Sequence, residues 1–152
     1  MVKIRRYRLS DNDQVKELHV LALKATYSYY THGSWDEDLD HIPEIYFPNG
    51  EFLVGELDNK IVAMGALKKI SNDIGEIKRI RVHPSLQRQG IGQQIYDLLE
   101  EKAREIGYKI LQLDTSIKQV GAQKLWQKNG YKELRRETEG YPLETIFYNK
   151  EL

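Results

Sequence analysis

Apolar and polar positions alternate along this chain with two periods, one typical of strands and one typical of helices. Strand-like alternation or short apolar runs predict strands over residues 3–7, 51–57, 61–67, 74–82, 109–113, 131–137 and 143–148. Helical spacing predicts a helix capped at Ser10 or Asp11, and helices over residues 34–42, 90–106 and 120–128. Turn residues at 58–60 join the second and third strands into a hairpin.

The order of these elements predicts the fold class. Hairpins dominate, and a single strand-helix-strand crossover connects residues 74–82 to residues 109–113. This mixture favours an α+β fold, or a mixed α/β sheet, over a doubly wound one. The chain has no internal repeat, low-complexity tract or linker, so we expect a single domain over residues 1–152.

The predicted strand over residues 74–82 breaks the period of two. Ile77 points to one face, whereas Ile80 and Val82 have the opposite parity. A strand that buries one face throughout needs an extra residue to do this, so the pattern predicts a β-bulge near residues 78–79. A strand buried on both faces is the alternative, and the interleaved cations favour the bulge. A bulge would separate neighbouring strands and leave a slot for an amide-bearing ligand.

The residues after this strand form a candidate anion site at the start of a helix: Gln87-Arg88-Gln89-Gly90-Ile91-Gly92. Unpaired N–H groups at a helix start attract anions, and the helix dipole adds to the attraction. Gly90 and Gly92 would let the backbone approach a phosphate, and Arg88 adds a cation. The segment is not a P-loop, because Gly-Lys-Ser/Thr is absent, nor a dinucleotide fingerprint, because position 95 is isoleucine. By itself it is equally compatible with a plain tight turn.

Composition narrows the class of protein. With 40% apolar and 30% charged residues, the balance is that of an ordinary globular chain. The absence of cysteine excludes disulfides and thiolate zinc sites and fits a cytoplasmic location; the histidine spacing predicts no metal site. Because 23 cations balance 23 anions, we expect no nucleic-acid partner. No apolar run predicts a signal peptide or a membrane span.

Two runs resemble the GCN5-related N-acetyltransferase (GNAT) superfamily. IKRIRVHPSLQRQGIG at residues 77–92 is similar to that family's acetyl-coenzyme A motif, and GAQKLWQKNGYKE at residues 121–133 is similar to its next motif. The resemblance implies a central mixed, mostly antiparallel twisted sheet with a bulged fourth strand, flanked by about four helices. It also implies transfer of an acetyl group from acetyl-CoA to an amine, and it allows a homodimer.

The resemblance further implies which residues bind coenzyme A. The pyrophosphate would lie on the backbone amides of Gln87, Arg88, Gln89, Gly90, Ile91 and Gly92, with Gln93 as a further candidate. The pantetheine arm would pair with the backbone of Ile80, Arg81 and Val82. Gln119 stands where many relatives have an asparagine, and its amide could still donate a hydrogen bond.

The catalytic groups are less regular. Glu76 occupies a position where many relatives place a carboxylate that accepts a proton through water; a surface glutamate is the alternative. Trp126 occupies the slot of a tyrosine that protonates the departing thiolate, and an indole N–H is a donor only. Trp126 would therefore pack beside coenzyme A or fill the core. Tyr131, Tyr141 and water stay open as sources of that proton.

For the acceptor, Tyr27, Tyr30 and Trp35 are candidate aromatic walls, and the acids at residues 36–40 could attract a cationic amine. Core packing and helix-dipole neutralisation are the alternatives for these residues, and the sequence favours them. Between function classes, an N-acetyltransferase acting on a small amine or a peptide leads, and a non-catalytic acyl-CoA sensor is the alternative.

Overall fold

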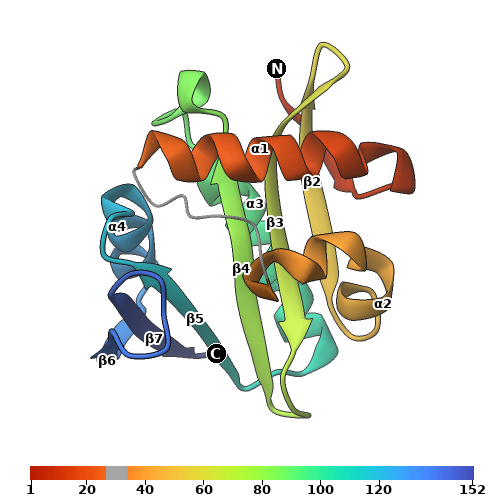
Figure 1. Cartoon of the computed structure of the whole chain (residues 1–152). Helices are drawn as coiled ribbons and strands as arrows, with labels where there is room; N and C mark the ends of the chain where they lie inside the picture. The colour runs from red at the N-terminus through yellow and green to blue at the C-terminus, as the bar shows by residue number, and fades with distance from the viewer. Residues whose placement is uncertain (27–33) are drawn as a thin grey trace.

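A seven-stranded sheet organises the computed structural model, which describes residues 1–26 and 34–152 (Figure 1). The strand order is β1-β2-β3-β4-β5-β7-β6, and every neighbouring pair is antiparallel except β4 and β5. The strands are β1 (Lys3–Arg6), β2 (Glu51–Leu57), β3 (Lys60–Lys69), β4 (Ile74–Val82), β5 (Ile110–Ser116), β6 (Lys132–Glu137) and β7 (Thr145–Glu151). The predicted mixed, mostly antiparallel sheet is confirmed.

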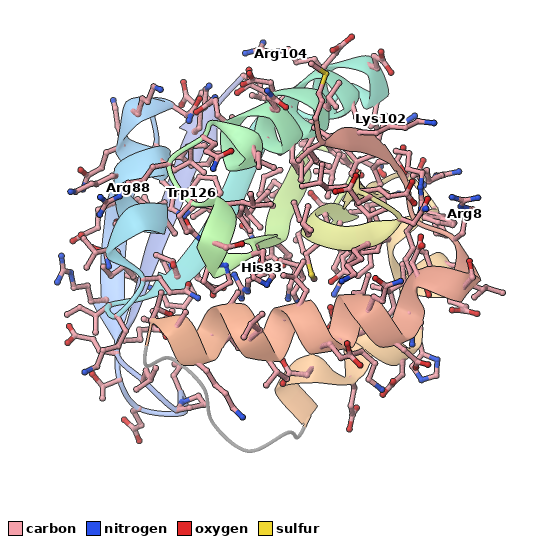
Figure 2. The ribbon with its side chains drawn as sticks, turned by 90° about the horizontal axis from the view of Figure 1, so that it is seen from above. Arg8, His83, Arg88, Lys102, Arg104 and Trp126 are labelled. Carbon is pink, nitrogen blue, oxygen red and sulfur yellow. The ribbon has the colours of Figure 1, made fainter. Side chains whose placement is uncertain are left out.

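Helices cover both faces of this sheet. They are α1 (Asn12–Ala25), α2 (Ile42–Tyr46), α3 (Ile91–Ile106) and α4 (Val120–Lys128), with short 3-10 helices at Leu9–Asp11, Ser34–Asp40 and Pro84–Leu86. α1 and α2 lie across one face of the sheet and α3 lies on the other, as the view from above in Figure 2 makes clear. The helix predicted over residues 34–42 is divided, because Pro43 at the second position of α2 favours a new helix start there.

The hydrophobic pattern explains how these layers pack. α3 turns its buried residues toward the sheet and ends at Ile106, and the φ of 103° at the following Gly107 gives the left-handed cap that glycine allows. The run of residues 61–67 in β3 is buried throughout, because helices cover this strand on both faces. Asp58 and Asn59 have φ values of 51° and 64°, as a type I′ hairpin turn between β2 and β3 requires. Within the described part of the chain, no helix combines the length and apolar character needed to cross a membrane.

We predict that Ile95→Ala lowers the free energy of unfolding by about 2–5 kcal/mol, because fully buried Ile95 joins α3 to the sheet. Urea denaturation followed by circular dichroism measures this loss. The matched control is Leu98→Ala on the same helix, where the side chain is 42% exposed and the expected loss is below about 1 kcal/mol. Equal losses at the two positions would contradict this packing of α3.

Candidate active site

A β-bulge interrupts β4 as the sequence predicts. Two residues of β4, Arg79 and Ile80, face the single residue Gly65 of β3. Arg79 has a φ of 61°, in the left-handed region that non-glycine residues rarely adopt. A Cβ atom at position 65 would lie 2.6 Å from the side chains of both Ile80 and Ile95, so the glycine lets β3 pass close to the bulge.

Two carboxylates neutralise the buried guanidinium of Arg79. Its Nε donates to Asp38 Oδ2 over 3.0 Å, and its Nη1 lies 3.5 Å from Asp36 Oδ1. The Tyr46 hydroxyl also donates to Asp38. Burial by itself would raise the pKa of Asp38, but the hydrogen bond and charge of Arg79 outweigh it and lower that pKa. Ion pairs between Arg79 of the bulge and the two carboxylates of the Ser34–Asp40 helix thus join these two elements.

The acidic segment at residues 36–40 therefore has partners within the protein. Asp36 and Asp38 pair with Arg79, and Asp36 Oδ1 also lies 2.9 Å from His19 Nε2. Asp40 Oδ1 accepts from Lys16 Nζ over 2.6 Å. These three carboxylates thus meet cationic or imidazole groups of the chain itself, and Asp36 also lies in the first turn of its helix, as the helix-dipole alternative expects.

A cleft opens where β4 and β5 separate. The two strands pair only where Ile74–Glu76 lies beside Ile110–Gln112, and they diverge beyond that point (Figure 1). The cleft holds about 240 Å³, and residues 77–81, residues 114–116, α4, residues 141–143 and the second half of α1 line it. Parallel strands that part leave facing N–H and C=O groups unpaired, so an extended amide-bearing ligand can hydrogen-bond there.

The loop before α3 presents free amides beside the end of this cleft. Gly90 caps the helix with a φ of 79°, and residues 87–90 are exposed. A Cβ atom at Gly92 would lie 3.7 Å from Val82 and 3.9 Å from Ile80, so the first turn of α3 faces the end of β4. The Gln87 side chain donates to the Val82 carbonyl over 2.8 Å and fixes the loop there. The sequence-predicted residues of strand and loop are thus brought together.

Gln93 contributes differently from the other loop residues. Its side-chain amide donates to Asp97 over 2.7 Å and to Asn129 over 2.8 Å. As the third residue of α3, it still has a backbone N–H without an intrahelical partner. Only its backbone is therefore available for an anion at this helix start.

α4 supplies the wall of the cleft on the loop side. The side-chain amide oxygen of Gln119, Oε1, accepts a hydrogen bond from the Thr115 hydroxyl over 2.7 Å, and the Gln119 residue lines the cleft. Trp126 also lines the cleft, and its ring packs edge-to-face on Tyr96 and Tyr131 with centroids 5.7 Å apart in each pair. Trp126 therefore belongs to the core, as one sequence alternative expects, and it also borders the cleft.

The indole of Trp126 also carries an unused donor. Its Nε1 is buried, and no hydrogen-bond partner lies near it among the described residues. A buried donor left unpaired costs about 1–3 kcal/mol. A ligand in the cleft that accepts this hydrogen bond would recover that free energy.

The two candidate phenols are separated. The Tyr131 hydroxyl accepts from Tyr96 over 3.0 Å within the core, and burial raises its pKa. Tyr141 lines the cleft, and reduced hydration raises its pKa as well. Of the two phenols, Tyr141 is the one that lines the cleft.

Glu76 lies where β4 and β5 last pair, just before the cleft opens. Its side chain is 15% exposed, accepts from Gln112 Nε2 over 3.2 Å and lies 3.7 Å from Lys78 Nζ. Glu76 itself does not line the cleft, whereas Asp114 does. The cleft walls, which reduce hydration, and the charge of Glu76 together raise the pKa of Asp114.

The sequence interpretation missed Asp114, although strand alternation carried a signal. Leu111 and Leu113 are buried on the α3 side of β5, so Asp114 faces the opposite side. Of the predicted acceptor residues, Tyr27 and Tyr30 fall outside the described part of the chain. Trp35 belongs to the Ser34–Asp40 helix.

We predict that Asp38→Asn destabilises the protein by about 3 kcal/mol at neutral pH, because it leaves Arg79 buried without its main partner. The pKa of Asp38 is lowered on folding, so its stabilisation is present above its ordinary value of 3.8 and is lost as the pH falls further. The difference between wild type and variant should therefore shrink below that pH.

Urea denaturation at several pH values measures this effect. The matched control is Asp73→Asn, whose carboxylate forms an exposed ion pair with Lys109 at 3.8 Å and should contribute below about 1 kcal/mol. A difference that stays constant down to the most acidic pH would contradict the assigned ion pair.

Known proteins resemble this chain in sequence. The profile of the Acetyltransferase (GNAT) family matches residues 15–131. An aminoalkylphosphonate N-acetyltransferase from Salmonella typhimurium is 32% identical over 91 residues, which cover 57% of this chain and 59% of that relative. The sequence likeness thus spans a little more than half of each protein.

Solved structures match over the whole chain. A GNAT-family acetyltransferase from Staphylococcus aureus Mu50 has a TM-score of 0.89 at 21% identity, covering 99% of both chains. The PaiA N-acetyltransferase of Thermoplasma acidophilum, in complex with coenzyme A, has a TM-score of 0.80 at 19% identity, covering 100% of this chain and 99% of that one. Since the family profile covers more than half of the sequence and the fold agrees, the chain belongs to the GNAT acetyltransferase family.

Proposed function

We propose that this protein transfers the acetyl group of acetyl-CoA directly to a primary amine of a small molecule or peptide. The observation that carries the proposal is the cleft between β4 and β5, which lies beside the amides of a helix start and is bordered by a carboxylate. Relatives that are acetyltransferases, and a structural neighbour bound to coenzyme A, support the same activity.

Coenzyme A would bind across three elements. The free amides of residues 87–92 would hold the pyrophosphate, with the exposed Arg88 guanidinium beside it. The backbone of residues 80–82 would pair with the pantetheine amides. Trp126 and Gln119 would donate further hydrogen bonds from α4.

Transfer requires a neutral amine, because an ammonium has no lone pair with which to attack the thioester. Asp114 borders the cleft and would pair with the incoming ammonium. Glu76 would accept the first proton through water between it and the cleft at Asp114. Backbone N–H groups at the bulge would polarise the acetyl carbonyl while the nitrogen attacks.

The charges in the cleft favour an acceptor that carries an acidic group as well as an amine. Lys78 and Arg81 line the cleft together with Asp114, so cations and an anion border the same space. Asp114 would pair with the ammonium and Lys78 with the acidic group. The relative named for aminoalkylphosphonates acts on a compound with both charges, which supports this class.

A coenzyme A-binding protein without catalysis is the second candidate function. The specific observation that favours it is Trp126, because an indole replaces the phenol that would protonate the leaving thiolate. Binding of coenzyme A would then be saturable without any transfer.

We predict that the protein releases the thiol of coenzyme A only in the presence of one class of amine. A disulfide reagent measures this release, and the protein adds no background because it contains no cysteine. The panel contains aminophosphonates, amino acids, polyamines, aralkylamines and short peptides. Saturable coenzyme A binding without release for any amine would support the second candidate.

Variants then assign the proton acceptor. Glu76→Gln should lower kcat about a hundredfold, whereas Glu101→Gln on the exposed side of α3 should leave it unchanged. Asp114→Asn should raise the KM for the amine more than it lowers kcat. A fall in kcat with Asp114→Asn alone would contradict the role of Glu76.

We predict that Arg88→Gln weakens coenzyme A binding about tenfold, because it removes a charge-assisted contact to phosphate. Isothermal titration calorimetry at several salt concentrations measures the Kd, and the variant should show the weaker salt dependence. The matched control is Arg104→Gln, whose guanidinium is 53% exposed near the other end of α3 (Figure 2). Equal effects of the two substitutions would contradict the assigned phosphate site.

A further inference from the structure

His19 is a buried titratable residue of the cleft, and it has no role in the mechanism proposed above. It lies on α1, is 2% exposed and lines the cleft between β4 and β5. Its Nε2 lies 2.9 Å from Asp36 Oδ1. An ionised carboxylate can only accept a hydrogen bond, so Nε2 carries the proton of the neutral ring and Nδ1 carries a lone pair.

This lone pair has no partner of its own. Nδ1 is buried, and none of the described residues hydrogen-bonds to it. A buried acceptor without a partner is disfavoured, and such groups are rare in folded proteins unless a ligand or a reaction uses them. If His19 were purely structural, its hydrogen bond from Nε2 to Asp36 would be enough, and a second polar atom such as Nδ1 would not be needed.

The ring is also fixed beside the bulge. Asp36 Oδ1 bridges His19 Nε2 and Arg79 Nη1, at 2.9 and 3.5 Å. Because Arg79 is itself a bulge residue, a single carboxylate oxygen ties the imidazole to the backbone that would polarise the acetyl carbonyl. The acceptor nitrogen must approach that carbonyl through the same cleft.

Burial, helped by two neighbouring cations, keeps the imidazole neutral. Burial lowers the pKa of His19, the cations Arg81 and Arg79 on β4 lower it further, and Asp36 opposes both effects. Asp114 faces the same cleft from β5. At neutral pH the ring is therefore in the form that accepts a proton, and Asp36 is in place to stabilise the cation that results.

We propose that Nδ1 of His19 accepts the second proton from the acceptor nitrogen during acetyl transfer. An ammonium loses one proton before it attacks, which is the part assigned to Glu76. After attack the new C–N bond leaves the nitrogen positively charged, and that nitrogen gives its second proton to Nδ1. The C–S bond then breaks, and the thiolate takes a proton from water or Tyr141. This inference rests on the proposed acetyltransferase function.

The test compares His19→Gln with His41→Gln, a histidine exposed at the start of α2. Glutamine can keep the donor to Asp36 but has no basic nitrogen at the Nδ1 position. We expect His19→Gln to lower kcat about a hundredfold and to leave the Kd for coenzyme A unchanged. The acid limb of the wild-type pH profile should contain a histidine contribution below the ordinary histidine pKa of 6.5, and the variant should lose that contribution. His41→Gln should match the wild type in all three measurements.

His19→Gln with wild-type kcat and an intact acid limb would overturn the inference. If this variant does not fold, long-range proton–nitrogen NMR of the wild-type protein decides the same point. We expect the His19 tautomer protonated at Nε2, with Nδ1 shifting when coenzyme A and the amine are both added; protonation at Nδ1 would overturn the inference. A wild-type protein that releases no thiol with any amine would instead contradict the proposed function, and the NMR measurement still tests His19.

Discussion

The ion pair between Arg79 and the carboxylates of Asp36 and Asp38 is the interaction on which the cleft depends. A guanidinium is stable away from water only when carboxylates compensate it, and a left-handed φ adds about 1–2 kcal/mol of backbone strain. The two costs fall on the same residue. The strand keeps its extra residue because the ion pair holds the side chain on the α1 side, while Gly65 leaves room for Ile80.

The extra residue has consequences for both faces of β4. Before the bulge, Ile77 packs against the α3 side, and after it Ile80 and Val82 return to that side. Without the bulge their parity would put them on the opposite face. Cations consequently border the cleft on the α1 side, and apolar side chains border it near α3 and α4. Under the proposed function, the start of α3 would hold the phosphates of the donor, and the charged side chains on the α1 side of the cleft would meet the acceptor.

Periodicity and turn chemistry in the sequence predicted most of the elements and the bulge. Parity together with the interleaved cations predicted a bulge near residues 78–79, and the structure has it at Arg79 and Ile80. The glycine-rich loop located the start of α3. What sequence reasoning missed were contacts between elements distant along the chain. Alternation along β5 indicates the face on which Asp114 lies, but it does not indicate that a cleft opens there or that Asp36 meets His19. A period fixes the face of an element and not the side chain opposite.

The same limit applies to the aromatic residues. Trp126 and Tyr131 are equally apolar in the pattern, yet only Trp126 borders the cleft, because α4 turns its inner face partly toward the opening. Tyr131 is held in the core by its contacts with Tyr96 and Trp126. Whether an aromatic residue borders the cleft or fills the core therefore depends on its contacts with other elements, which no local signal in the sequence contains.

The cleft separates proton donors from proton acceptors by environment. Reduced hydration disfavours the charged form of every group, so it raises the pKa of Tyr141 and lowers that of His19. At neutral pH the Tyr141 phenol is protonated, and the His19 imidazole is neutral, with one nitrogen lone pair available. Acetyl transfer to an amine needs this pair of states, because protons leave nitrogen while sulfur gains one. Under the proposed function, a tyrosine in place of Trp126 would not be required, because Tyr141 already lines the same cleft.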